Sequence, residues 1–362
     1  MTIRPMKILY VVNSADAQSI PLELGLRIRE RAPGMIVAGY YSDSKYPTDH
    51  AAGEVVTLGA KTAFDRQAIG AIFRTIRREK PDVIHVHHAV SALFCWLAWL
   101  STFCRGNLVK TEHNDHRFLP WHQKAINYLL YPFCARIICN SQSTQDSFNR
   151  LEKILAGKRS LPIYNGVDMD KVLAAEPTGG VTAEKDPDAP LVIGHVGRLV
   201  PQKNQVRLVR ALARARAISG RDIRIEVIGG GALEEQLRAT AAEEGVSEVF
   251  TLLGPKTRAE VYAALYRWDG FVMPSVFEGF CNALVEAMAA GTPLACSDIV
   301  TLREVAGPHA ARFPVEDVEA MAEALIEIAT QPRGLDRPFA IDRYSMTLAV
   351  DRHLALYAEI TA

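Results

Sequence analysis

The sequence predicts an α/β protein with two domains, each a parallel β-sheet covered by helices. Short apolar runs alternate with longer segments of helical length along almost the whole chain. That alternation is typical of strands that pair in parallel and are joined by crossover helices. At 362 residues the chain also exceeds what one hydrophobic core usually holds. A polar stretch rich in Pro and Gly, 176–190, precedes the second series of runs and reads as a loop rather than a third domain.

In the first half of the chain, six apolar runs predict strands and the segments between them predict helices. The first run is too short to form the core of a signal peptide. The segment 21–31 is assigned to a helix from its place between two strands, although its apolar residues alternate with a period of two. The predicted strands are 7–12, 35–41, 55–58, 83–86, 108–111 and 136–140, and the predicted helices include 21–31, 65–79 and 121–134.

The segment 89–104 is the most hydrophobic part of the chain and contains no charged residue. It is shorter than the roughly 20 residues that a bilayer-spanning helix needs. It also directly follows a predicted strand, as the helix of a βα unit does. We therefore expect a core helix here rather than a membrane contact.

The second half of the chain repeats the same pattern. The final segment, 344–360, carries apolar residues at several positions that a helix would bury. The predicted strands are 191–196, 223–228, 250–253, 270–273 and 293–296, and the predicted helices are 205–218, 233–244, 258–266, 282–290 and 317–330.

Charge and cysteine content narrow the class of protein. The 41 basic and 41 acidic residues balance, which argues against a nucleic-acid-binding protein. The six cysteines form no C-x-x-C pair and no zinc-binding spacing, so we expect reduced thiols in a cytoplasmic protein. His85, His87 and His88 have no carboxylate or cysteine nearby to complete a metal site, and we predict no bound metal.

The segment from Pro274 to Pro293 carries the clearest chemical signal. Glu278 stands in a glycine-containing loop, and Glu286 stands eight residues later inside a run of good helix formers. The helix is predicted to begin near Asn282, so the two carboxylates lie up to about 12 Å apart. This spacing suits a ligand with two polar ends joined by a charged bridge, which would meet the N–H groups at the helix start.

This segment resembles the retaining glycosyltransferases of family 4, which have the GT-B architecture of two Rossmann-like domains facing across a cleft. The resemblance implies that Glu278 binds hydroxyls of the transferred sugar and Glu286 binds the nucleotide ribose. It makes the residues between them part of the donor site: Gly279, Phe280, Cys281 and Asn282. It also implies an acceptor-binding domain at 1–164, a nucleotide-sugar-binding domain at 165–343, and a terminal helix, 344–362, that returns to the first domain.

A nucleotide-sugar donor also needs groups that hold its diphosphate. The stretch from Gly194 to Gln205 follows a predicted strand and resembles the family's phosphate loop, which makes Arg198 and Lys203 the diphosphate clamp and part of the catalytic site. The resemblance adds Gly229, Gly230 and Pro255 to the donor site. A glycine triplet such as 229–231 is equally compatible with a tight turn.

Residues of the first domain are implicated as well. The segment 110–115 resembles the family's Thr-x-His motif, so that His113 would face the donor sugar as a catalytic residue; a structural histidine is the alternative. Relatives often carry two glycines after the first strand, whereas residues 13–19 contain none. We therefore do not expect this loop to bind the donor, and retain Asp16 and Gln18 as candidates for acceptor contact.

The expected activity is retaining, metal-independent transfer of a sugar from a nucleoside diphosphate to an acceptor hydroxyl. The pair Asp168 and Asp170 has the spacing of a metal-binding Asp-x-Asp motif but falls in the segment between the domains, so we reject it. The family implies UDP as the carrier, no cofactor, and a saccharide or lipid-linked saccharide of the bacterial cell envelope as the acceptor. Alternatives are an epimerase or phosphorylase of the same fold, or a nucleotide-sugar-binding protein without turnover.

Two segments suggest contact with an anionic membrane. Arg74, Arg77, Arg78 and Lys80 form a basic run, and an aromatic tract extends over 116–131. Basic residues near Phe, Trp and Tyr suit a surface that rests on anionic lipid. A solvated helix face and a buried aromatic helix are the alternatives. We therefore expect a cytoplasmic protein that associates peripherally with the inner membrane.

Overall fold

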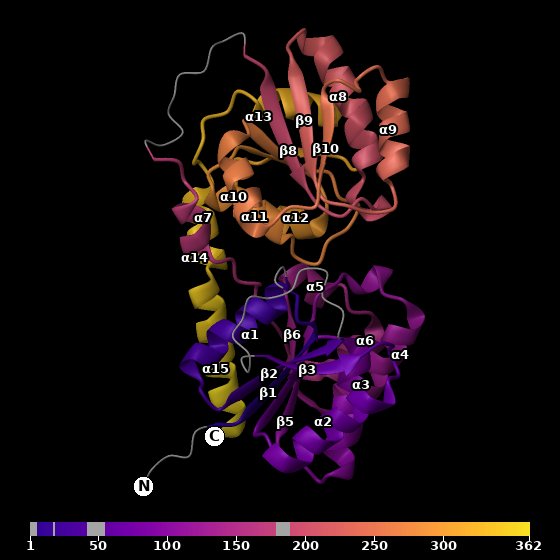
Figure 1. The fold of residues 1–362 in the computed structure, drawn as a ribbon, viewed down its shortest axis with the longest axis vertical. Helices are drawn as coiled ribbons and strands as arrows, with labels where there is room; N and C mark the ends of the chain where they lie inside the picture. Colours follow the sequence, from indigo (N-terminus) through magenta and orange to yellow (C-terminus); the bar gives the residue numbers. More distant parts are fainter. Residues whose placement is uncertain (1–5, 17–18, 42–54, 179–188) are drawn as a thin grey trace. The chain divides into compact units, whose positions relative to one another are not determined.

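The computed structural model describes residues 6–16, 19–41, 55–178 and 189–362. The chain divides into two compact units (Figure 1). Unit 1 comprises Met1–Gly166 with Met346–Ala362, and unit 2 comprises Val167–Ser345. The boundaries expected from the sequence, 164/165 and 343/344, differ from these by two residues.

The described residues of unit 1 form a seven-stranded parallel sheet in the order β3-β2-β1-β4-β5-β6-β7. The order reverses direction between β1 and β4, which gives the doubly wound, Rossmann-like topology. The sequence analysis missed β7, which has only three residues and ends in a proline. The strands are β1 Ile8–Ser14, β2 Met35–Tyr41, β3 Val55–Ala60, β4 Val83–Val86, β5 Asn107–Glu112, β6 Cys134–Cys139 and β7 Ser160–Pro162.

Helices cover the sheet of unit 1. The helix predicted at 21–31, whose apolar residues alternate with a period of two, is confirmed as α1. The hydroxyl of Ser19 caps α1 by accepting from the N–H of Leu22. Both Leu22 and Leu24 are buried because α1 packs against the strands and against α15, which explains the misleading period of two. The helices are α1 Ile20–Arg31, α2 Arg66–Glu79, α3 Ala89–Ser101, α4 Trp121–Leu130, α5 Gln142–Asp146, α6 Arg150–Ala156 and α15 Met346–Thr361, with short 3₁₀ turns η1 His116–Phe118, η2 Tyr131–Phe133 and η3 Gly157–Arg159.

The C-terminal helix α15 belongs to unit 1, as expected. Its residues Met346, Val350 and Tyr357 share a core cluster with Ile8 and Tyr10 of β1. The predicted core helix at 89–104 is α3, which packs against α2 and α4. No helix in the described part of the chain is long and apolar enough to cross a bilayer.

Unit 2 repeats the architecture with a six-stranded parallel sheet in the order β10-β9-β8-β11-β12-β13. The short strand β13, Ala311–Phe313, was not predicted. The other strands are β8 Leu191–Val196, β9 Ile223–Ile228, β10 Phe250–Gly254, β11 Gly270–Met273 and β12 Leu294–Ser297. The helices are α7 Met169–Ala174, α8 Gln205–Ser219, α9 Glu234–Glu243, α10 Arg258–Arg267, α11 Asn282–Ala289, α12 Val300–Val305, α13 Val318–Ile328 and α14 Arg337–Tyr344.

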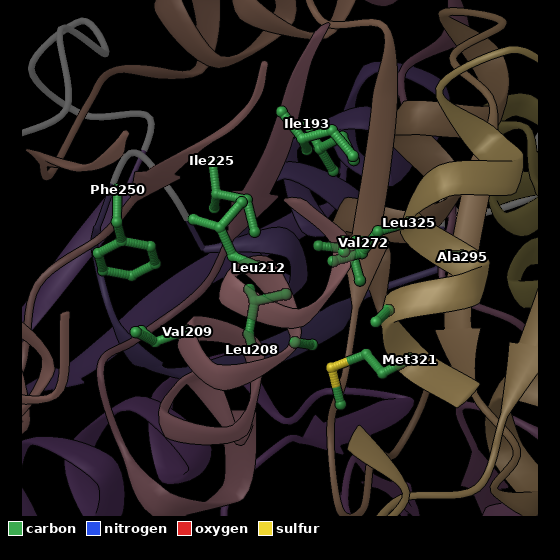
Figure 2. Packing of buried hydrophobic residues seen from close by; sticks show 14 of the residues in the cluster. Ile193, Leu208, Val209, Leu212, Ile225, Phe250, Val272, Ala295, Met321 and Leu325 are labelled. Atoms are coloured by element: carbon green, nitrogen blue, oxygen red, sulfur yellow. The ribbon is translucent and has the colours of Figure 1, made fainter. Parts of the chain in front are cut away.

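One apolar cluster holds the sheet of unit 2 against α8 and α13. Leu208 and Leu212 of α8 point toward Ile225 of β9, while Leu325 of α13 lies beside Val272 of β11 (Figure 2). All five side chains are fully buried. This packing fixes the central strands β8, β9 and β11, so the loops at their carboxyl ends converge on one edge of the sheet.

Candidate active site

A cation and a carboxylate meet at the carboxyl edge of the sheet in unit 2. Lys203 ends the 3₁₀ turn η4, Pro201–Lys203, which follows β8, and Glu278 lies in the loop between β11 and α11. The Nζ of Lys203 donates to Oε1 of Glu278 at 2.5 Å, and the hydroxyl of Ser275 donates to the same oxygen at 2.6 Å. The other oxygen, Oε2, has no partner within the described ranges, so it can accept hydrogen bonds from a ligand.

Hydrogen bonds to backbone carbonyls fix the two loops that carry this pair. The side-chain amide of Gln202 donates to the carbonyl of Phe277 at 2.8 Å, and the N–H of Val276 donates to the carbonyl of Gln202 at 2.8 Å. On the other side, the hydroxyl of Thr301 donates to the carbonyl of Glu278 at 2.9 Å. Glu278 is therefore held through its backbone as well as its side chain.

Lys203 remains charged in this environment. Burial works to lower the pKa of the ammonium, but the adjacent Glu278 carboxylate outweighs it and the pKa is raised. Only 14% of the Lys203 side chain is exposed, so water screens this charge weakly. A second cation, Arg198, lies in the same loop and is exposed to solvent. Its guanidinium has no hydrogen-bond or ion-pair partner in the part of the chain that the structure describes.

Two buried polar residues position the Arg198 loop, and the sequence analysis gave them no role. The side-chain amide of Gln205 donates to the carbonyl of Arg198 at 2.8 Å and lies 3.3 Å from Nε2 of His195. The Nδ1 of His195 donates to the carbonyl of Val272 at 2.9 Å, which leaves Nε2 as an acceptor. Burial lowers the pKa of His195 to about 4, so the ring is neutral. The available signal was His195, a polar residue within the apolar run 191–196, whereas Gln205 follows a polar stretch that gave no signal.

The start of α11 supplies the other half of the site. Glu286 is buried on the second turn, and the hydroxyl of Tyr262 on α10 approaches its Oε1 at 3.4 Å. Cys281 precedes the helix with a φ of +82°, a strained conformation for a side-chain-bearing residue. The Oδ1 of Asn282 is buried and has no hydrogen-bond partner among the described residues. Strain and an unsatisfied polar atom are both typical of a binding site.

The glycine triplet after β9 is explained by the approach of two backbones. A Cβ on Gly229 would lie 1.9 Å from the carbonyl oxygen of Gly197, and one on Gly231 would lie 2.4 Å from that of Leu199. Gly230 accepts a hydrogen bond from the N–H of Leu199 at 3.0 Å, and its Cα faces the ring of Pro255. These glycines therefore let the β9 loop pack against the β8 loop that carries Arg198.

The candidate residues of unit 1 form a separate constellation. The Nε2 of His113 lies 3.0 Å from Nδ1 of His87, and burial lowers the pKa of His113 to about 4. The side chain of Asn140 donates to the carbonyl of His113 at 3.2 Å. Asp16 is partly exposed beyond β1, whereas Gln18 lies outside the described residues. His87 is thus the direct partner of His113.

Behind His113 lies a buried chain of charged groups that the sequence analysis did not foresee. Lys110 donates to Glu112, and the hydroxyl of Tyr131 donates to the same carboxylate oxygen at 2.7 Å. His116 lies between Glu112 and Glu152, with its Nδ1 2.8 Å from Oε1 of Glu152. Burial works to lower the pKa of His116, but the two carboxylates outweigh it and raise the pKa to about 9.

The other sequence candidates have structural roles. Asp168 caps α7 by accepting from the N–H of Lys171 and also pairs with its ammonium. His85 contacts the hydroxyls of Tyr357 and Thr111. Within the described ranges, no group of three or more His, Cys, Asp and Glu residues is placed to hold a metal ion. All six cysteines are unpaired thiols.

Comparison with known families matches both units. Residues 182–341 match the family described as glycosyl transferases group 1, and residues 37–171 match the family described as glycosyltransferase family 4. Two parallel Rossmann-like units that match these two families identify the chain as a GT-B-fold glycosyltransferase. Its second unit is similar to the glycosyl transferases group 1, and its first unit is similar to glycosyltransferase family 4.

Curated relatives are similar over parts of the chain. A phosphatidyl-myo-inositol mannosyltransferase of Mycobacterium leprae is 26% identical over 77% of this chain and 74% of its own length. An N-acetylgalactosaminyltransferase of Campylobacter jejuni is 31% identical over 47% of this chain. Its full name is N-acetylgalactosamine-N,N'-diacetylbacillosaminyl-diphospho-undecaprenol 4-alpha-N-acetylgalactosaminyltransferase, and the match spans 43% of its length.

Solved structures show the same fold over nearly the whole chain. Anabaena HepE in complex with UDP has a TM-score of 0.75 at 18% identity, with 98% of this chain and 100% of HepE covered. Sucrose-phosphate synthase from Thermosynechococcus elongatus has a TM-score of 0.78 at 16% identity, with 98% and 99% covered.

Proposed function

We propose that the chain transfers a sugar, with retention of configuration and without a metal ion, from a UDP-sugar to a hydroxyl of a lipid-linked saccharide. The reaction would serve the assembly of a bacterial cell-envelope polysaccharide or lipopolysaccharide at the cytoplasmic face of the inner membrane. The observation that carries the proposal is the contact of Lys203 with Glu278 beside Arg198, at the carboxyl edge of a Rossmann-like sheet.

The residues of unit 2 suit the parts of such a donor. Arg198 and Lys203 provide two positive charges for the diphosphate, and the N–H groups at the start of α11 add to them. The Oε2 of Glu278 is the acceptor for hydroxyls of the transferred sugar, since Lys203 and Ser275 occupy Oε1. Glu286, on the second turn of α11, is then the group for the ribose hydroxyls.

The proposed chemistry exchanges one bond at the anomeric carbon for another on the same face. The bond between this carbon and the phosphate oxygen breaks as the bond to the acceptor oxygen forms, and the acceptor proton passes to the departing phosphate. Negative charge grows on the diphosphate during this step. Arg198 and Lys203 stabilise that charge in place of a metal ion, which is the kind of electrostatic stabilisation that contributes most to many enzymes.

The relatives support the identity of both substrates. HepE was solved in complexes with UDP, with UDP and glucose, and with UDP-glucose. The Campylobacter relative is named for an acceptor on diphospho-undecaprenol, and the Mycobacterium relative for phosphatidyl-myo-inositol. Both acceptors are carried on lipids, which favours a lipid-linked acceptor here.

The test is product analysis with a panel of UDP-sugars and polyprenyl-diphosphate-linked saccharides. We expect a new glycoside with the donor's anomeric configuration, detected by NMR, and activity that persists in EDTA. Inversion of configuration would overturn retention, and loss of activity in EDTA with recovery in magnesium or manganese would overturn the metal-free mechanism. Conversion of the UDP-sugar without any acceptor would instead identify an epimerase, and a requirement for phosphate would identify a phosphorylase.

A further inference from the structure

Exposed apolar side chains are concentrated on one part of unit 1. Of the fourteen large hydrophobic side chains that are exposed in the described part of the chain, nine lie between residues 97 and 154. Phe103 is 90% exposed, Trp121 80% and Ile154 66%, and apolar side chains that gather on one surface are typical of an interaction site. The clustering of these side chains indicates a surface that binds a partner.

The elements that carry these side chains pack against one another. Helix α4 contacts both α3 and α6, and the turn η2 contacts α4 and α6. The three helices lie side by side along one flank of unit 1 (Figure 1). We call this the α3–α4–α6 surface and define it by Leu97, Phe103, Trp121, Leu129, Phe133 and Ile154. The aromatic tract 116–131 is only partly on this surface: Trp121 is exposed, whereas Tyr131 is buried.

The charges on these elements have a single sign. The segments 89–106, 116–133 and 150–159 contain one acidic residue, Glu152, which is completely buried and held by His116. The same segments carry seven basic residues outside the core, of which Arg117 pairs with Asp115: Arg105, Arg117, Lys124, Arg150, Lys153, Lys158 and Arg159. The whole chain is neutral, so this local imbalance is not a consequence of composition.

We propose that the α3–α4–α6 surface docks the protein on an anionic lipid bilayer, with Trp121 and Phe103 inserted at the interface and the basic side chains on lipid headgroups. Apolar anchors with a basic rim match the interfacial mode of membrane binding. A second copy of this chain fits poorly, because a symmetric dimer would place the same basic residues against each other. This inference rests on the proposed function, because a lipid-linked acceptor would be reached at the membrane surface.

The test is flotation with vesicles of phosphatidylcholine alone and with an equal share of phosphatidylglycerol. We expect binding to the anionic vesicles that weakens in high salt. The double substitution Lys153→Ser/Lys158→Ser should weaken binding to the anionic vesicles about 25-fold, since each basic residue near the surface contributes about fivefold. Phe103→Ser/Trp121→Ser should weaken it at least as much.

Matched control variants remove side chains of the same kinds from unit 2. Ile218→Ser/Val300→Ser removes two hydrophobic side chains of unit 2 that are each 47% exposed, and Arg210→Ser/Arg312→Ser removes two exposed cations of that unit. Both should bind vesicles as the parent does. Equal losses in the controls, or no binding to anionic vesicles at all, would overturn the proposal. A dimer in sedimentation equilibrium that Trp121→Ser dissolves would show a self-association surface instead.

Trp121 provides a direct readout of insertion. The other three tryptophans are buried or partly buried, so a blue shift of emission on adding vesicles reports mainly on Trp121. Trp121→Phe should keep binding and lose the blue shift. UDP binding, measured by calorimetry on each variant, should stay at the parental value. Loss of lipid binding with intact UDP binding therefore separates failure of this inference from failure of the proposed reaction.

Discussion

The ammonium of Lys203 and the carboxylate of Glu278 lie 2.5 Å apart, although 75 residues separate them in the chain. The first follows β8 and the second follows β11, and these two strands are neighbours in the sheet of unit 2. The fold therefore brings together a cation suited to phosphate and a carboxylate suited to sugar hydroxyls. The carboxylate raises the pKa of Lys203 against the effect of burial, so removing Glu278 would also change Lys203.

The diphosphate clamp gives the first prediction. Arg198→Ala and Lys203→Ala should each lower kcat by two or more orders of magnitude, because in the proposed reaction each removes a charge that stabilises the departing diphosphate. Steady-state kinetics at saturating donor measures this. The matched control is Lys171→Ala, which removes an exposed lysine on α7 and should leave kcat unchanged. Near-normal turnover in both clamp variants would remove these residues from the mechanism.

The second prediction concerns the ribose. Glu286→Ala should weaken UDP binding by about 1.5–3 kcal/mol, the usual value of a hydrogen bond to a charged group, and change kcat much less. Ribose contacts are shared by the ground and transition states, so their loss appears in affinity. Calorimetry with UDP measures the effect. Tyr262→Phe is the control: it removes a hydroxyl that lies 3.4 Å from Oε1 of Glu286 but keeps that carboxylate, and should change affinity far less than Glu286→Ala. Unchanged UDP affinity in Glu286→Ala would refute the ribose role.

The sequence was sufficient to predict the architecture and the main elements. Strands buried on both faces of a parallel sheet are continuous apolar runs, and runs such as 35–41, 191–196 and 223–228 were placed at the observed bounds. The short edge strands β7 and β13 were missed because three residues carry no periodic signal. The prediction of helix α1 was correct although its apolar residues alternate with a period of two. The pattern is misleading because α15, from the other end of the chain, packs against α1 and buries a second face of it.

The candidate site was predictable only in part. Motif spacing placed Lys203 and Glu278 in loops that the structure brings into contact. Ser275 and Gln205 lie within the two motif segments but were given no role, because they act through hydrogen bonds that depend on tertiary packing. The structure also gives the glycine triplet a packing role, which its sequence could not distinguish from ligand binding.

The third prediction concerns the two histidines of unit 1. His87→Leu removes the partner 3.0 Å from Nε2 of His113, so the ring of His113 loses its fixed orientation. We expect kcat to fall roughly 10- to 100-fold, as is typical for a misplaced catalytic group, while UDP affinity stays unchanged because Arg198 and Lys203 lie in unit 2. His113→Ala should lower kcat at least as much. Parental kcat in both variants would assign the pair a purely structural role.

The fourth prediction is a loss of stability in acid caused by buried neutral histidines. Burial lowers the pKa of both His195 and His353 to about 4, below the value of about 6.5 in an unfolded chain. The unfolded state therefore binds more protons between pH 6.5 and 4, and stability falls as the pH falls through this window. His353→Leu should reduce the slope of unfolding free energy by about 1.4 kcal/mol per pH unit there.

Thermal unfolding at pH 7, 6, 5 and 4.5 measures this dependence. The control is His122→Leu, since His122 is exposed on α4 and its replacement should leave the slope unchanged. Equal acid sensitivity in His353→Leu and the parent would contradict the prediction that the buried neutral ring of His353 contributes to the loss of stability in acid.

The last prediction concerns His116, whose pKa is shifted in the opposite direction. Glu112 and Glu152 outweigh the effect of burial and raise the folded-state pKa to about 9, so the stability that this charge contributes is fully present below about pH 6.5 and is lost as the pH rises through 9. His116→Gln should destabilise unit 1 by about 3–5 kcal/mol at neutral pH, because it leaves two buried carboxylates without their shared cation. Urea unfolding followed by fluorescence reports mainly on unit 1, which holds Trp96, Trp99 and Trp121. The gap between parent and variant should narrow when the pH is raised from 7 to 10, whereas His122→Gln should match the parent at both values. A gap that stays constant would mean that His116 contributes through packing and not through its charge.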